Sequence, residues 1–188
     1  MVFSAIQVHV NAQICNLRII DDNALDYFFT SECINYKSLT DSTRKLDNPL
    51  TNPNHNWKTD HLNDSSIPWT TQISKSGISD DWQGEAWYRV MGGAGTRIPE
   101  NPFTMAQFGN DKYCRTNCPG YLPSGSHPQT PGELVTDVKV CYNCNAEYFN
   151  GNMCNYSKNY VKIRHCGNYF VYFLTQNTVT WAARYCTE

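Results

Sequence analysis

Nine cysteines constrain this chain of 188 residues more than any other feature of its sequence. Seven of them lie between Cys114 and Cys186. Disulfides persist in oxidising compartments, so a cysteine density of this kind is typical of a secreted or extracellular protein. Because nine is an odd number, at least one thiol is either free or paired with another chain.

The length and charge of the chain exclude several classes of partner. A chain of 188 residues is expected to form one domain with a sizeable core. Its 15 basic and 17 acidic residues give a formal net charge of −2, which provides no electrostatic basis for binding nucleic acid or an anionic membrane. No run of 18 apolar residues occurs, so the sequence predicts no membrane span.

A strand that runs into a glycine-rich turn is predicted between Trp87 and Glu100. The first residues of this stretch are bulky and aromatic, as in a half-buried strand. Gly92, Gly93 and Gly95 follow, and glycine adopts positive φ without steric cost. Because no Gly-Lys-Ser/Thr pattern and no helix follow, we interpret the turn as structural rather than phosphate-binding.

The rest of the chain also favours strands over helices. Two β-type segments flank Gly167-Asn168, which is the arrangement of a tight hairpin. The expected strands lie within residues 67–90, 134–140, 160–164, 169–174 and 178–185. The sequence therefore predicts a β-rich fold (α+β with little helix) of antiparallel sheets and hairpins stapled by disulfides.

Two segments are expected to lie outside the compact body. Residues 1–30 are predicted to form an N-terminal arm or a remnant leader, because Val10-Asn11-Ala12 resembles a signal-peptidase site without a positively charged start. Residues 31–188 then form a cysteine-rich domain. It carries a loop-like insert at about 47–66, where Asn, Asp, Pro and Thr dominate.

The spacing of four cysteines leaves a zinc site as an alternative. Cys114 and Cys118 are separated by three residues, and Cys141 and Cys144 by two. Four thiolates at such spacings can surround a tetrahedral zinc ion, as in a zinc-binding adaptor. This interpretation leaves the last three cysteines of the chain unexplained.

Two sequons favour secretion and glycosylation. Asn63-Asp64-Ser65 and Asn155-Tyr156-Ser157 both match the acceptor pattern for N-linked glycan. We therefore expect Asn63 and Asn155 to be glycosylation sites.

Three tyrosines are candidates for a recognition surface. Tyr142, Tyr148 and Tyr156 lie in a loop-like, Asn-rich stretch, where we expect them to be exposed. Tyrosine rings combine apolar area with a polar tip, which suits contact with an extracellular protein or glycan ligand.

The sequence predicts no active site. His127 lies in a Gly-Ser-His-Pro segment and is expected to be a turn residue. Cys141-x-x-Cys144 lacks the βαβ context of a redox pair, and the acidic segment 80–85 lacks the spacing of a calcium loop. The expectation is no catalytic residue, no metal site and no cofactor, with a secreted enzyme of unrecognised site as an alternative.

Motifs along most of the chain match a known domain in order. They are Cys33-Ile34-Asn35-Tyr36-Lys37-Ser38-Leu39, Trp87-Tyr88-Arg89, Gly95-Thr96-Arg97-Ile98-Pro99-Glu100, Gly125-Ser126-His127-Pro128, Val161-Lys162-Ile163-Arg164-His165-Cys166, Tyr169-Phe170-Val171-Tyr172-Phe173-Leu174 and Tyr185-Cys186. Over about residues 31–187, the chain resembles the eight-cysteine domain shared by uromodulin, the pancreatic secretory granule glycoprotein and the oncoprotein-induced transcript protein. The resemblance implies a secreted or cell-surface, non-catalytic glycoprotein module for extracellular recognition or matrix assembly.

The resemblance also implies which cysteines pair. The implied bridges are Cys33–Cys166, Cys114–Cys186 and Cys141–Cys154. Family cysteines would also fall at Asp80, Pro102, Met153 and Trp181, so both partners of two further family bridges are missing together.

Three cysteines fall outside the family pattern. We predict that Cys118 and Cys144 pair with each other. Cys15 is then left over, either as a free thiol or as the site of an intermolecular bridge in a homodimer.

Overall fold

The computed structural model describes residues 30–47, 57–60, 76–102, 113–116, 118–143, 154, 159–176 and 183–188. The predictions for residues 1–29, including Cys15, lie outside this part of the chain, as do those for Asn63, Cys144, Tyr148, Asn155 and Tyr156. Within the described ranges, no helix is both long and apolar enough to cross a membrane.

Strands make up most of the regular structure, so the prediction of a β-rich fold with little helix is confirmed. The helical elements are α2 (Ser31–Ile34) and the 3-10 turns η1 (Ser42–Arg44) and η2 (Gly92–Ala94). The strands are β1 (Lys37–Leu39), β2 (Trp57–Thr59), β3 (Ser76–Ile78), β4 (Ala86–Val90), β5 (Cys118–Tyr121), β6 (Leu134–Lys139), β7 (Cys141–Tyr142), β8 (Tyr160–His165), β9 (Phe170–Leu174) and β10 (Ala183–Tyr185).

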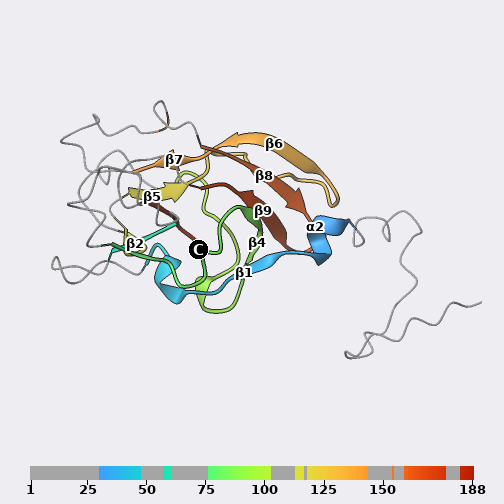
Figure 1. Ribbon diagram of the computed structural model, residues 1–188. Helices are drawn as coiled ribbons and strands as arrows, with labels where there is room; N and C mark the ends of the chain where they lie inside the picture. The colour runs from blue at the N-terminus through green and yellow to red at the C-terminus, as the bar shows by residue number, and fades with distance from the viewer. Residues whose placement is uncertain are drawn as a thin grey trace, which may run out of the picture.

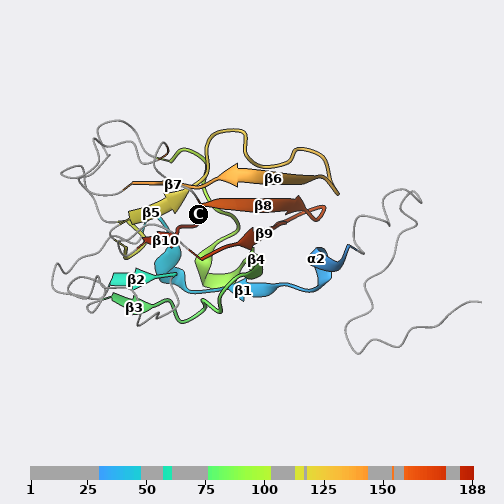
Figure 2. The same ribbon diagram turned by 45° about the horizontal axis from the view of Figure 1, so that its top comes forward.

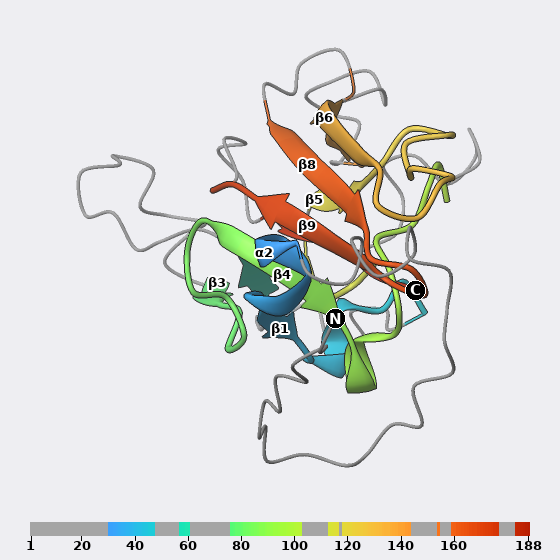
Figure 3. The ribbon, with the colours of Figure 1, turned by 90° about the vertical axis from the view of Figure 1, so that its right-hand side faces the viewer.

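The main sheet has five strands in the order β1-β4-β9-β8-β6, which Figure 3 shows side by side. The predicted hairpin forms between β8 and β9, with Ile163 opposite Tyr172. Gly167 in its turn has φ 87°, a conformation that glycine adopts without steric cost. β9 then pairs with β4, so strands from the middle and the end of the chain meet in the centre of the sheet (Figure 1).

Parallel pairs make the sheets mixed rather than purely antiparallel. β1 runs parallel to β4, and β10 runs parallel to β5 in a second sheet of order β10-β5-β7. β2 and β3 form a separate parallel pair. Figure 2 shows these smaller sheets at one end of the five-stranded sheet. Two parallel strands need a long connection instead of a tight turn, so no local turn signal in the sequence predicts that they pair.

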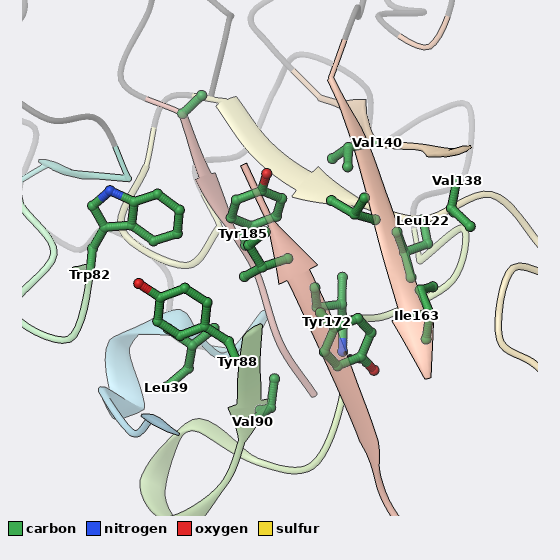
Figure 4. Close-up of a cluster of buried hydrophobic side chains, with 14 of the residues drawn as sticks. Leu39, Trp82, Tyr88, Val90, Leu122, Val138, Val140, Ile163, Tyr172 and Tyr185 are labelled. Carbon is green, nitrogen blue, oxygen red and sulfur yellow. Dashed lines mark hydrogen bonds between the residues drawn. The ribbon is translucent and has the colours of Figure 1, made fainter. Parts of the chain in front are cut away.

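The two sheets share one hydrophobic core. Tyr88 and Val90 on β4 point inward, alternating with Trp87 and Arg89, as the two-residue period of a strand requires. The ring of Trp82 stacks on Tyr88 with centroids 5.3 Å apart (Figure 4). Burying each large side chain of this kind contributes about 1.5–3 kcal/mol. The core therefore fixes β4, which leads directly into the glycine-rich turn.

A buried charge network lies beside this core. Arg44 is fully buried, and its Nη2 lies 2.8 Å from Asp60 Oδ1 and 2.6 Å from Asp81 Oδ1. Its Nη1 also donates to the backbone oxygen of Tyr185 at 3.0 Å. Burial alone would raise the pKa of Asp81, but the hydrogen bonds and charge of Arg44 lower it. The acidic segment 80–85 thus supplies an ion-pair partner, which the sequence did not indicate.

Disulfides join distant parts of the chain. The structure contains Cys33–Cys166, Cys114–Cys186 and Cys141–Cys154, the three pairs that the family resemblance implies. Cys118 is disulfide-bonded as well, and its pairing with Cys144 stays a prediction because Cys144 lies outside the described residues.

The zinc alternative is wrong. It required free thiolates at Cys114, Cys118 and Cys141, and all three sulfurs are in disulfides. A disulfide sulfur has no thiolate to offer a metal. Within the described ranges, no group of three or more residues of metal-ligating type lies close enough to hold an ion.

Candidate functional site

A surface pocket of about 430 Å³ lies where β4 enters the glycine-rich turn. Residues 89–92 and 95–97 form one side of the pocket, and residues 168–170, at the turn between β8 and β9, form the other. Both sides come from motifs that carry the family resemblance. The volume is within the usual range for ligand sites, roughly 300–1,000 Å³.

The glycine-rich turn gives one side of the pocket its shape. Gly92 has φ 62° and Gly95 has φ 95°, both in the region that favours glycine. A Cβ at Gly95 would meet the backbone oxygen of Glu188, which approaches that closely. The same oxygen accepts a hydrogen bond from the amide of Thr96 at 2.7 Å. The last described residues of the chain therefore hold this turn in place.

Arg89, on β4, is a positive charge in the lining of the pocket. Its Cζ lies 3.8 Å from the centroid of the Tyr169 ring and 5.8 Å from that of Tyr36. Its Nη1 donates to the Tyr36 hydroxyl at 3.0 Å. Its Nε is buried and has no hydrogen-bond partner among the described residues. The guanidinium is therefore held by aromatic faces, which attract a cation without neutralising it.

The disulfide Cys33–Cys166 anchors the two rings that hold Arg89. Both sulfurs pack in a small cluster with Val171, Tyr36 and Tyr169. The Tyr169 hydroxyl donates to the backbone oxygen of Cys33 at 2.8 Å. The bridge thus fixes the segment that carries Tyr36 onto the hairpin that carries Tyr169. It positions the cation without touching the pocket itself.

Arg97 contributes a second guanidinium at the rim of the pocket. Half of its side chain is exposed, and its Nε lies 2.5 Å from Glu188 Oε1. No hydrogen bond from its terminal nitrogens is found within the described ranges, so these donors are available to a ligand. The pocket therefore combines one arginine paired at its rim with one for which the described part of the chain provides no carboxylate partner.

His127 lies behind the pocket rather than in it. Its Nδ1 is 2.6 Å from Glu100 Oε1, and its Nε2 is 2.8 Å from the Tyr172 hydroxyl. Its ring contacts Phe170, a pocket residue, at a centroid distance of 4.6 Å. The expected turn context is correct, but the residue is only 5 % exposed. Burial raises the pKa of Tyr172 well above its usual range, so its hydroxyl stays protonated and donates to Nε2.

This burial predicts a pH dependence of stability. Burial lowers the pKa of His127, although the adjacent Glu100 opposes the shift. The unfolded chain gains a proton near pH 6.5, whereas the folded protein keeps the ring neutral to lower pH. The contribution of His127 to the free energy of unfolding is therefore complete above about pH 6.5. It decreases as the pH falls toward the lowered pKa, by at most about 1.4 kcal/mol per pH unit.

Urea unfolding between pH 7.5 and 5.5 checks this expectation with the variant His127→Gln. The variant is expected to show a flatter decline than the parent protein over this window. Above pH 7, the free energies of unfolding of the two proteins are expected to change with pH by the same amount, which serves as the control. Equal slopes across the whole window would contradict the assignment of a neutral, buried imidazole.

The expected tyrosine surface is wrong at Tyr142. This residue is fully buried, and its hydroxyl accepts a hydrogen bond from Asn159 Nδ2 at 2.7 Å. The physical reason is the short strand β7, which pairs with β5 and turns the ring toward Gly120 in the core. Tyr148 and Tyr156 lie outside the described residues, and the pocket, which the sequence did not indicate as a site, lies elsewhere.

Comparison with known proteins identifies the family. Residues 88–187 match the family model of the uromodulin-like domain. The chain is 30% identical over 160 residues to the pancreatic secretory granule membrane major glycoprotein GP2 of Mus musculus, covering 83% of this chain and 23% of the relative. It is 32% identical over 131 residues to the Rattus norvegicus protein of that name, covering 68% and 22%. For the Canis lupus familiaris protein the identity is 30% over 102 residues, covering 54% and 17%.

The matched region contains the elements described above. It includes all the residues that line the pocket and both cysteines of the bridges Cys114–Cys186 and Cys141–Cys154. The chain spans less than a quarter of the length of these curated relatives. The chain belongs to the family of uromodulin-like domains.

Proposed function

We propose that this chain is a non-catalytic recognition module of a secreted or cell-surface glycoprotein. The observation that carries the proposal is the pocket on a disulfide-stapled frame, where Cys33–Cys166 holds the aromatic rings around Arg89. Disulfides that tie distant segments suit an oxidising compartment. The relatives are, by name, secretory granule membrane glycoproteins, which supports the same setting.

The hydrogen-bonded polar groups behind the pocket favour binding over catalysis. Glu100, His127 and Tyr172 form a hydrogen-bonded series, but His127 and Tyr172 are buried and the series includes no serine or cysteine nucleophile. Recognition needs only shape, charge and hydrogen bonds at a pre-formed cavity, and the pocket offers all three. An extracellular protein or glycan is the proposed class of ligand.

The untested sites extend this proposal. Asn63 and Asn155 are proposed glycan acceptors, and Cys15 is proposed as a free thiol or the link of a homodimer. Comparison of molecular mass before and after glycan removal reports occupancy. A non-reducing gel of the protein with Cys15→Ser, beside the parent protein, reports the covalent dimer.

One experiment tests the proposed function directly. The protein is produced through the secretory pathway and applied to arrays of glycans and of extracellular protein domains, before and after reduction of its disulfides. The expected result is saturable binding to at least one ligand, lost on reduction because the pocket frame loosens. Fully oxidised, folded protein that binds no ligand on either array contradicts a recognition role. Folding only in a reducing cytosol contradicts the extracellular setting.

A further inference from the structure

We infer that the pocket beside the glycine-rich turn binds the carboxylate of an acidic sugar. This inference rests on the proposed function, because it names the ligand class of the same site. Arg89 supplies the charge that a carboxylate would pair with. Arg44, Arg97, Arg164 and Arg184 each form an ion pair with a carboxylate. No such pair is found for Arg89 among the described residues.

Arg89 is also held rigidly, so its charge keeps a fixed position. Buried donors in folded proteins almost always have a partner, and a buried donor without one needs an explanation. The buried Nε of Arg89 has none within the described ranges, although the side chain is held in place by Tyr36 and Tyr169. The Nε is enclosed, so a carboxylate in the pocket would pair with the guanidinium as a rigidly held charge.

Arg97 adds a second cationic group to the lining of the same cavity. Its Nε is occupied by Glu188, and its terminal nitrogens are left for a ligand. Glu188 is the carboxylate at the rim, and it compensates Arg97 rather than Arg89. The pocket thus retains net positive character, which a ligand carrying one negative charge would neutralise.

The remaining pocket residues suit a sugar ring. Thr96 and Asn168 are exposed and supply neutral hydrogen-bonding groups for hydroxyls. Met91, also exposed, and Phe170 supply apolar surface on which the C–H face of a sugar can pack. A single ring with one carboxylate matches this combination of cations, neutral polar groups and apolar surface.

The position of the pocket disfavours an extended acidic peptide. Peptides commonly bind such folds by adding a strand to a free sheet edge. The pocket adjoins the ends of β4 and β9, and both strands already have neighbours on each side in the five-stranded sheet. The site is therefore closed to strand addition and open to a compact ligand.

Amide chemical-shift titration of the oxidised protein tests the inference. The probes are the methyl glycoside of N-acetylneuraminic acid, methyl galactoside as a neutral sugar, and a glutamate-rich peptide. The acidic sugar is expected to shift amides of residues 89–97 and 168–170 in a saturable way. The shifts should weaken at about 0.5 M salt, because exposed charges are then screened. The neutral sugar and the peptide are expected to leave these amides unchanged.

Two variants and a matched control locate the binding site. Arg97→Gln and Arg89→Lys are expected to weaken binding of the acidic sugar by about tenfold or more, since each removes charge-assisted hydrogen bonds. Lys162→Gln removes the same charge from an exposed residue of β8 outside the pocket, and should change affinity by less than about twofold. Unchanged spectra away from the pocket confirm that each variant is folded.

Three results would overturn the inference. The first is the absence of shifts at the pocket with the acidic sugar. The second is binding of the peptide or neutral sugar there with equal or greater affinity. The third is an equal effect of Arg97→Gln and Lys162→Gln on the affinity for the acidic sugar. The proposed function fails separately. If the arrays reveal a ligand whose binding is insensitive to Arg97→Gln, the module is a recognition domain and only the acidic-sugar assignment is wrong.

Discussion

Replacing Arg44 with Leu is expected to lower the free energy of unfolding by about 3–5 kcal/mol, the usual cost of leaving buried charges without their partner. The change leaves two carboxylates without the charge of Arg44, those of Asp60, which is fully buried, and Asp81, whose side chain is 8% exposed. It also removes the hydrogen bond from Arg44 to the backbone oxygen of Tyr185. Urea unfolding at pH 7 followed by tryptophan fluorescence measures the difference.

The neighbouring cation provides a matched control. Lys45 pairs with Asp47 at 3.7 Å, and the two side chains are 38% and 77% exposed. Exposed ion pairs contribute little, so Lys45→Gln is expected to change the free energy of unfolding by less than about 1 kcal/mol. A loss below about 1 kcal/mol for Arg44→Leu as well would show that the network does not hold η1 to the β10 and β3–β4 segments.

Removing the bridge Cys33–Cys166 by a double substitution to Ala is expected to produce the second large effect. The two cysteines are 133 residues apart in sequence, the longest separation among the three bridges described above. In the loop-entropy description, such a bridge stabilises the folded state by about 4–5 kcal/mol through its restriction of the unfolded chain. Thermal unfolding of the oxidised double variant, beside the parent protein, measures the loss.

The short bridge Cys141–Cys154 provides the comparison for this prediction. Cys141 and Cys154 are 13 residues apart in sequence, for which the same description gives about 3 kcal/mol. The double variant of Cys33–Cys166 is expected to lose more stability and also affinity at the pocket, because the rings around Arg89 lose their anchor. Equal affinity in both double variants would contradict the positioning role of Cys33–Cys166.

Elements with a local signal were predictable from the sequence. The hairpin of β8 and β9 follows from two β-type segments around Gly167-Asn168, and the strand before Gly92 follows from its aromatic residues. Turn chemistry and the two-residue period act over a few neighbouring residues, so they are readable without knowledge of the fold. The resemblance to the family then implied which cysteines pair, a question that the spacing of the cysteines alone left open.

Elements that depend on distant partners were not predictable in the same way. Tyr142 lies in a loop-like, Asn-rich stretch, and only its pairing with β5 buries it. The sequence around His127 indicates a turn, and only its contacts with Glu100 and Tyr172 make it a buried, neutral residue. Arg44 has no apolar sequence context, and its burial depends on Asp60 and Asp81 from separate segments. Such contacts are set by tertiary packing, which overrides local preference.

The pocket illustrates the same limit. Its two sides come from the glycine-rich turn and the β8–β9 turn, both predicted as structure and neither as a site. What brings them together is the pairing of β4 with β9. Arg89 alternates with core residues on its strand, and the sequence contains no sign that Tyr36 and Tyr169 will hold it.

The central claim is that disulfides between distant segments define this uromodulin-like domain, and peptide mapping of the non-reduced protein, produced through the secretory pathway, tests it most directly. The account predicts peptides that link Cys33 with Cys166, Cys114 with Cys186, Cys141 with Cys154, and Cys118 with Cys144. Separate recovery of Cys33 and Cys166 as reduced thiols, or of Cys118 joined to a cysteine other than Cys144, would contradict it.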